Sequence, residues 1–295
     1  MLAQSPPRIV YRARVPDPAV LLDRIGLSSP PPATLDGLRA IHRAYLTAIP
    51  YDDLSVQLGE AGRLDVDALV ARLLTGGRGG YCFELNGVLA WLLEELGFEV
   101  ERHESVVGPR DPQAPINHLA LVVRVDGERW LADAGLGEGP IEILPLRPGT
   151  YLDPLSWTVD ADPAGGWWLT PHEWSSLPGL HIAEPVVDFD AFQPHHHRLA
   201  TSPESKFVQT LVVQRPYPDR IVTLRSRTLR TDGPGVGERR VLEDRDDFAT
   251  VLDEIFRIDP GALGPERLDR LWARVEAQHR AWEAEQASAG AQPVR

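Results

Sequence analysis

Cysteine and lysine are almost missing from this chain. Its 295 residues include one of each, Cys82 and Lys206. A single cysteine cannot form an internal disulfide bond, and this suits a reducing compartment. No stretch approaches the roughly 18 apolar residues that a membrane span needs, and the first residues lack the apolar core of a signal peptide. We therefore expect a cytoplasmic protein with no membrane partner.

Positive charge is also in short supply. The formal net charge is −13 and the isoelectric point is near 5.1. Nucleic-acid binding depends on Lys and Arg side chains that neutralise phosphates, so this balance argues against a nucleic-acid partner. The length allows about two or three domains.

The single cysteine lies in an unusual setting. Cys82 follows Gly79-Gly80 and opens an apolar run, Phe83 to Leu96, which predicts a helix that ends at Gly97. A thiol at a helix N-terminus faces unpaired backbone N–H groups and the positive end of the helix dipole, so we expect a lowered pKa for Cys82. The alternative is a buried structural cysteine, as most lone cysteines are.

A nucleophilic thiol needs a base, and a hairpin downstream supplies a candidate. Asp126-Gly127 between two strand-like runs predicts a two-residue turn that pairs 125 with 128 and 123 with 130. In that register His118 lies opposite Gly135, which leaves room for the ring, and Asp133 is its diagonal neighbour, roughly 7–8 Å away at the backbone. The hairpin therefore predicts a His118–Asp133 hydrogen bond. Taken singly, His118 could contact only water, and Asp133 could merely cap the turn at 134–135.

These segments together resemble those of a known family, the arylamine N-acetyltransferases. The resemblance covers nearly the whole chain, and its most specific part is Arg78-Gly79-Gly80-Tyr81-Cys82-Phe83-Glu84, followed by Asn86, by His118 and by Asp133-Ala134-Gly135-Leu136-Gly137. It implies a catalytic triad of Cys82, His118 and Asp133. The implied reaction is ping-pong transfer of an acyl group from a coenzyme A thioester, through an acyl-cysteine, to an amine.

The resemblance also implies a fold and a set of partners. The implied fold is α+β, with an N-terminal helical bundle (1–97) that carries the nucleophile, a central β-barrel-like domain (98–205) and a C-terminal α/β lid (206–295) around a cysteine-protease-like catalytic core. Acetyl-CoA would be a co-substrate, with no permanently bound cofactor and no metal. The acceptor would be an arylamine, a hydrazine or an N-hydroxyarylamine.

Some positions depart from the family pattern and keep alternatives open. Leu136 stands where the family usually has Phe, and Tyr51 lies in an altered Pro50-Tyr51-Asp52-Asp53 segment. We expect Tyr51 and Leu136 to line the substrate pocket. The family includes amide synthases that release polyketide chains as lactams from a carrier-bound thioester, so an acyl carrier protein is a possible partner. A cysteine hydrolase and a catalytically silent binding protein are further alternatives.

Capping and turn-forming residues along the chain predict the remaining helices and strands. Asp17, Thr34 and Asp65 are expected to cap three helices, short strands are expected from Phe98 to about Pro203, and further strands over 207–213 and 220–229. Helices are predicted over 246–256 and from Gly264-Pro265 onward.

Three smaller features of the sequence could have a functional or structural role. Gly135 and Gly137 could approach the phosphates of the coenzyme through backbone N–H groups, although a plain turn is equally consistent with them. His195-His196-His197 reads as strand, where neighbouring side chains point to opposite faces, which argues against a shared metal ion. We expect Glu84 to pair with Arg78 and hold the loop before Cys82.

Overall fold

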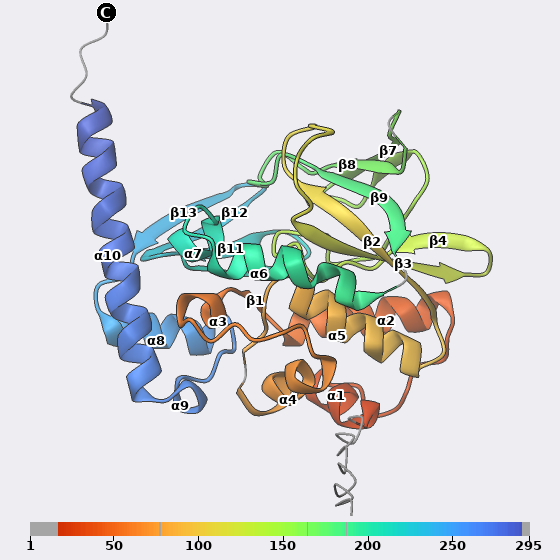
Figure 1. Ribbon diagram of the computed structural model, residues 1–295, viewed down its shortest axis with the longest axis horizontal. Coiled ribbons are helices and arrows are strands. Elements are labelled where there is room, and N and C mark those ends of the chain that lie inside the picture. The colour runs from red at the N-terminus through yellow and green to blue at the C-terminus, as the bar shows by residue number, and fades with distance from the viewer. Residues whose placement is uncertain (1–16, 77, 164, 187, 291–295) are drawn as a thin grey trace, which may run out of the picture.

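The computed structural model describes residues 17–76, 78–163, 165–186 and 188–290. It contains helices on one side of a large curved sheet and a second, smaller sheet that is flanked by the C-terminal helices (Figure 1). Within this part of the chain, no helix is both long and apolar enough to cross a membrane.

The N-terminal part is helical, as predicted. Its helices are α1 (Pro18–Arg24), α2 (Leu35–Ala48), α3 (Leu54–Gln57), α4 (Val66–Gly76) and α5 (Cys82–Glu95). The three predicted capping side chains are confirmed, because Asp17, Thr34 and Asp65 each accept a hydrogen bond from a backbone N–H in the first turn that follows.

The larger sheet forms a nearly closed barrel. Its strands are β2 (Glu99–Val107), β3 (His118–Val125), β4 (Glu128–Leu131), β5 (Leu144–Pro145), β6 (Gly149–Tyr151), β7 (Trp157–Ala161), β8 (Trp167–Thr170) and β9 (Leu180–Val186). They are ordered β5-β4-β3-β2-β9-β8-β7-β6. The two edge strands, β5 and β6, are separated in sequence only by residues 146–148, so this short link holds the open edges near each other.

Strand β3 is the contact between the barrel and the helices. Leu119, Leu121 and Val123 pack into a core with α5 and the other N-terminal helices, whereas Ala120 and Val122 face a separate core inside the barrel. Successive side chains of a strand point to opposite faces, so both faces of β3 are buried. Helix α5 is buried along almost its whole length against this strand.

The predicted hairpin register is confirmed where the ladder exists. Val125 pairs with Glu128, Val123 with Trp130 and Val122 with Leu131. Both turn residues, Asp126 and Gly127, have positive φ, as a two-residue turn of this kind requires. Strand β4 ends at residue 131, so the chain leaves the ladder before Asp133.

The C-terminal part contains the smaller sheet, ordered β1-β10-β11-β12-β13. Its strands are β1 (Tyr51–Asp52), β10 (Val212–Pro216), β11 (Ile221–Arg225), β12 (Thr228–Gly233) and β13 (Val236–Val241), and its helices are α8 (Arg245–Glu254), α9 (Pro260–Leu263) and α10 (Pro265–Gly290). Strand β1 comes from the N-terminal part of the sequence and pairs with β10. The helices predicted over 246–256 and from residue 265 are confirmed.

Two predicted strand regions are helical instead. Residues 189–209 form η1 (Phe189–Phe192), α6 (Gln193–Thr201) and α7 (Lys206–Gln209). Pro194 lies in the first turn of α6, where its missing N–H costs no hydrogen bond. The triple histidine is therefore on a helix, and the expected strand over 207–213 starts only at residue 212.

The expected strand over 220–229 is two strands, β11 and β12, with a turn at Ser226-Arg227.

Candidate active site

Cys82 is the first residue of α5 and is buried. Its Sγ lies 3.6 Å from the carbonyl oxygen of Asn117, and the backbone N–H groups of Phe83 and Leu119 act on the sulfur so as to lower the pKa of the thiol. The thiol is thus held against the start of β3, between the backbone groups on either side of His118. The predicted position at a helix N-terminus is confirmed.

The expected lowering of the Cys82 pKa is wrong for the thiol in this structure. Burial raises the pKa of Cys82, and the negative charge of Asp133 adds to that rise, whereas the two backbone N–H groups oppose it. Desolvation of a thiolate in a closed site outweighs the stabilisation by the helix N-terminus. A free thiolate is therefore disfavoured at this position.

His118 and Asp133 form the hydrogen bond that the hairpin predicts. The distance between His118 Nε2 and Asp133 Oδ2 is 2.7 Å, and both side chains are buried. The bond uses Nε2, so Nδ1 is the ring nitrogen that remains for other partners. The carboxylate orients the imidazole and favours the tautomer with the proton on Nε2.

The space left by the missing side chain of Gly135 is occupied by helix α5 and not by the ring of His118. A Cβ atom at Gly135 would lie 2.7 Å from the Cα of Cys82 and 2.9 Å from Nδ2 of Asn86. The absence of a side chain therefore allows α5 to approach the loop that follows Asp133, whereas we had expected it to make room for the ring of His118. The backbone N–H of Gly135 also donates to Asp133 Oδ1, at 2.8 Å.

Asn86 joins the three segments of the site. Its Nδ2 donates to Asp133 Oδ1 at 2.7 Å and to the Leu119 carbonyl at 2.6 Å, while its Oδ1 accepts from the Ala134 N–H at 2.9 Å. The side chain is fully buried, and residue 86 is one helical turn after Cys82. Asn86 thereby connects α5, β3 and the loop with Asp133. The sequence motif contained Asn86, but nothing in the sequence alone assigned it these contacts.

The loop before Cys82 is held by charged side chains, although not by the predicted pair. Glu84 pairs with Arg72 at 2.6 Å and accepts from the Tyr81 N–H at 3.2 Å, while Arg78 lies 3.7 Å from Glu60. Arg72 also donates to the Gly79 carbonyl. Helix α4 packs against α5 and brings Arg72 to Glu84, although Arg78 is nearer to Glu84 in the sequence.

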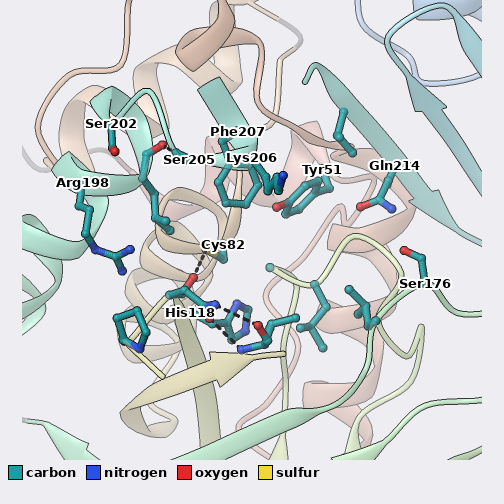
Figure 2. Close-up of a pocket in the computed structure, with 18 of the residues that line it drawn as sticks. Tyr51, Cys82, His118, Ser176, Arg198, Ser202, Ser205, Lys206, Phe207 and Gln214 are labelled. Atoms are coloured by element: carbon teal, nitrogen blue, oxygen red, sulfur yellow. Dashed lines mark hydrogen bonds between the residues drawn. The ribbon is translucent and has the colours of Figure 1, made fainter. Parts of the chain in front are cut away.

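Cys82 and His118 lie on the wall of a cavity of about 430 Å³ (Figure 2). Tyr51 and Leu136 also line it, so they lie where the sequence analysis expected a substrate pocket. Gly135 belongs to the same wall. Gly137, with φ +70, lies beside Gln214 and Tyr51. Binding of substrate or coenzyme by these four residues stays a prediction.

The cavity carries positive charge in a strongly acidic protein. Arg198, Lys206 and Arg225 line it, together with one carboxylate, that of Glu204, and with Ser202 and Ser205. Arg198 and Ser202 lie on one side of Cys82, whereas Gln214 and Ser176 lie on the other (Figure 2). Arg198 donates to the Ile116 carbonyl at 2.5 Å, so its side chain is anchored. The sequence analysis identified none of these residues as site residues, although the lone lysine was a signal that it used only for composition.

The three adjacent histidines have structural neighbours. The Nδ1 of His196 lies 2.5 Å from the Tyr81 hydroxyl, its Nε2 lies 2.7 Å from the Gly62 carbonyl, and His195 lies 3.7 Å from Glu104. Among the described residues, no group of three or more His, Cys, Asp or Glu side chains is arranged to hold a metal ion.

Comparison of the sequence with known proteins gives a consistent result. The profile of the N-acetyltransferase family matches residues 34–262. An arylamine N-acetyltransferase of Mycolicibacterium smegmatis is 35% identical in an alignment of length 264 that covers 82% of this chain and 92% of the relative. A Salmonella typhimurium protein described as arylamine N-acetyltransferase / N-hydroxyarylamine O-acetyltransferase is 41% identical over 116 residues, 39% of this chain and 41% of that protein.

Solved structures agree with the sequence matches. The M. smegmatis arylamine N-acetyltransferase superposes with a TM-score of 0.78 at 31% identity, covering 87% of this chain and 98% of that one. The Mycobacterium marinum enzyme in complex with CoA gives a TM-score of 0.79 at 28% identity, covering 88% and 98%. Fold and profile together define an N-acetyltransferase. The chain belongs to the arylamine N-acetyltransferase family, and the resemblance noted in the sequence is confirmed.

Proposed function

We propose that this protein transfers an acetyl group from acetyl-CoA to an arylamine, a hydrazine or an N-hydroxyarylamine through an acetyl-cysteine at Cys82. The observation that carries the proposal is the position of the only thiol in the chain. Its sulfur is held beside His118, which is hydrogen-bonded to Asp133, on the wall of a cavity large enough for small substrates. Membership of the arylamine N-acetyltransferase family supports the same reaction.

In the first half-reaction Cys82 Sγ attacks the thioester carbonyl of acetyl-CoA. Burial raises the pKa of Cys82, so the thiol proton passes to His118 within the site and does not have to leave for solvent. The resulting imidazolium remains paired with the Asp133 carboxylate. A bond forms between Sγ and the acetyl carbon, the bond from that carbon to the coenzyme A sulfur breaks, and His118 returns the proton to the leaving thiolate.

Backbone N–H groups near the sulfur are suited to the charge that develops on the carbonyl oxygen. Those of Phe83 and Leu119 are the backbone groups that favour the thiolate of Cys82, so they are the nearest candidates to meet negative charge at the reacting centre. We propose the N–H of Phe83, at the N-terminus of α5, as the first candidate for this oxyanion. Its amide is held by the helix and needs no rearrangement.

The cations of the cavity are suited to the phosphates of coenzyme A. Arg198, Lys206 and Arg225 line the cavity and can attract an anionic donor there, although the whole protein has a net charge of −13. The CoA complex of the M. marinum relative supports a free coenzyme donor. Gly135 and Gly137 stay candidates for backbone contacts to the coenzyme.

In the second half-reaction the amine attacks the acetyl-cysteine. His118 takes one proton from the attacking nitrogen, the carbon–sulfur bond breaks, and the Cys82 thiol re-forms as His118 returns the proton. The named relatives are acetyltransferases, and none of their descriptions mentions lactam release or a carrier protein. The amide-synthase alternative therefore receives no support.

Intact-protein mass spectrometry tests the proposal directly. The wild-type protein and a Cys82→Ser variant are each incubated briefly with acetyl-CoA in the absence of amine. We expect one added acetyl group, about 42 Da, on the wild type only, because Cys82 is the sole cysteine. Acetylation of Lys206 or of the N-terminus would persist in the variant and is thereby distinguished.

Discharge of the adduct separates a transferase from a hydrolase. Aniline added to the acetylated protein should remove the acetyl group much faster than buffer alone and should yield acetanilide. Equal rates with and without amine would support a cysteine hydrolase. Failure of the wild type to acquire any acetyl group from acetyl-CoA would contradict the proposal.

A further inference from the structure

A second buried carboxylate lies close to the cavity and has no role in the acetyl-transfer steps above. Glu138 is 4% exposed, and four donors surround its two oxygens. Its Oε1 accepts from Ser176 Oγ at 2.7 Å and from Gln214 Nε2 at 2.8 Å. Its Oε2 accepts from the Ser176 N–H at 2.6 Å and from Ser175 Oγ at 2.9 Å.

These contacts determine which way the surrounding polar groups point. Four donors point at the carboxylate, so its two oxygens serve as acceptors. The hydroxyl hydrogens of Ser175 and Ser176 are directed at Glu138, and so is the NH₂ group of Gln214. What these side chains can offer elsewhere is their acceptor atoms. A buried carboxylate thus turns this part of the wall into a surface of hydrogen-bond acceptors.

Gln214 is the clearest case, since its two amide ends are chemically opposite. Its Nε2 is held by Glu138 and lies 3.3 Å from Thr223 Oγ1. The amide cannot rotate by 180° without aiming its own carbonyl oxygen at the Glu138 carboxylate, which is repulsive. In Figure 2 the oxygen of Gln214 turns toward the cavity and the nitrogen turns away from it.

Gly137 leaves the space that this orientation needs. A Cβ atom at residue 137 would lie 2.1 Å from Gln214 Oε1 and 3.1 Å from Tyr51 Cδ1. Within the part of the chain that the structure describes, no hydrogen bond reaches Gln214 Oε1. The cavity wall beside Tyr51 therefore presents a carbonyl oxygen that is available to a ligand.

This acceptor surface lies on the opposite side of Cys82 from Arg198 and Ser202 (Figure 2). Arg198 places a cation on its side of the cavity, and Arg225 acts electrostatically on Tyr51, beside the acceptor surface. What distinguishes the Gln214 side is therefore its hydrogen-bond acceptors, which suit a ligand that carries a donor, and the sulfur of Cys82 lies between the two sides.

We propose that Gln214, oriented by Glu138, is a specificity-determining residue that selects acceptor amines carrying a second hydrogen-bond donor, such as a ring hydroxyl. Gln214 Oε1 accepts that hydrogen bond while the amine of the same molecule reaches the acetyl-cysteine. This inference rests on the proposed function, because it deepens the account of the acceptor. Glu138 is a positioning residue that acts through Gln214.

Two amines of nearly equal nucleophilicity provide the test. p-Aminophenol carries the second donor, and p-anisidine replaces it by a methoxy group. Dissociation constants for both amines are measured by ligand-observed NMR on the protein without coenzyme, alongside kcat/KM with acetyl-CoA. We expect the wild type to prefer p-aminophenol about fivefold in both measurements, as one net hydrogen bond allows.

Three variants locate the source of the preference. Gln214→Met keeps the approximate volume of the side chain but removes the carbonyl, and the ratio between the two amines should fall to about one. Glu138→Gln removes the charge that orients the amide and should lower the ratio by at least half. Ser175→Ala is the matched control, because it removes a donor to Glu138 from a residue outside the cavity lining and should keep the preference.

Several results would overturn the inference. Equal binding of the two amines by the wild type would overturn it. A preference that survives in Gln214→Met would also overturn it, because the size of the methoxy group would then explain the preference. Thermal unfolding of each variant verifies that it is folded, and Glu138→Gln provides an independent route if Gln214→Met is not. The binding ratio does not depend on acetyl transfer, whereas absence of the acetyl-cysteine adduct contradicts only the proposed function.

Discussion

Two buried carboxylates on one loop, Asp133 and Glu138, both accept from neutral donors, but only Asp133 also has an ionisable partner. Asp133 is bonded to an imidazole, His118, which can carry a proton and a charge. Glu138, five residues later, is bonded only to hydroxyl and amide donors that cannot change charge. In the proposed mechanism the side chain of Asp133 therefore supports proton movement at Cys82. That of Glu138 can only organise the groups around it.

The difference shows that burial alone does not identify a functional acid. Both side chains are almost inaccessible to solvent, at 1% and 4% exposure. Their partners decide what each does. A carboxylate bonded to an ionisable group can influence proton transfer, whereas one bonded only to neutral donors orients those donors. Matched substitutions at the two positions can separate these roles.

The largest effect is expected for Asp133→Asn. The new amide can still accept from Asn86 and Gly135, but its NH₂ group faces His118 Nε2 and favours the wrong imidazole tautomer. We expect kcat/KM for acetyl transfer to fall by about 10,000-fold with little change in fold. The same change at Glu138, Glu138→Gln, should cost less than about tenfold, because it affects hydrogen bonds and no proton transfer. Equal losses at the two positions would contradict the comparison.

Glu138→Leu should produce the largest loss of stability. It leaves the four donors of Ser175, Ser176 and Gln214 facing an apolar side chain, and unpaired buried donors are costly. We expect the free energy of unfolding to fall by about 3 kcal/mol, measured by urea denaturation. Ser175→Ala, which removes a single donor, should cost about 1 kcal/mol. A Glu138→Leu protein as stable as the wild type would show that the carboxylate does not hold this wall together.

Asn86→Ala tests whether Asp133 depends on its neutral donor. The substitution removes the bond to Asp133 Oδ1 and the bonds to Leu119 and Ala134, so the carboxylate and its loop lose their anchor to α5. We expect a loss of about 10- to 100-fold, mainly in kcat, since the acetyl-donor contacts are elsewhere. A rise in KM with unchanged kcat would indicate a substrate-binding role instead.

The smallest effect concerns a third buried carboxylate, Asp53, which resembles neither of the other two. Its Oδ1 accepts from the Val212 N–H, while no hydrogen bond to Oδ2 is found among the described residues. Burial raises the pKa of Asp53 well above its usual range, and the charge of Asp52 adds to the rise. The folded protein therefore retains this proton at pH values where the unfolded chain has lost it.

The sign of the pH dependence follows from that difference. From about pH 4 up to the raised pKa, the folded state binds more protons than the unfolded state, so the Asp53 contribution to stability decreases as pH rises, by at most about 1.4 kcal/mol per pH unit. Asp53→Asn should flatten the decline between pH 5 and 7, measured by urea denaturation against the wild type. An identical slope in the two proteins would mean that Asp53 does not titrate in this range.

The sequence predicted most helix positions and the His118–Asp133 pair, because the signals for both are local. Capping by Asp17, Thr34 and Asp65 depends on residues within one turn, and the Asp126-Gly127 turn sets the hairpin register over a few residues. The region over 189–209 was mistaken for strand because its short helices are weak in periodicity. The domain boundaries proposed from the sequence stay a prediction, and the pairing of β1 with β10 joins the first of the proposed domains to the third.

What the sequence determined by itself was the set of candidate reactive side chains, Cys82, His118 and Asp133, and the local turn that pairs two of them. The tertiary structure decided the rest. Packing of α5 on β3 brings the sulfur to His118 and buries it, which reverses the expected direction of the Cys82 pKa shift. The contact between Glu138 and Gln214 spans 76 residues. Desolvation and long-range hydrogen bonds depend on every segment that surrounds a group, and no local pattern contains that information.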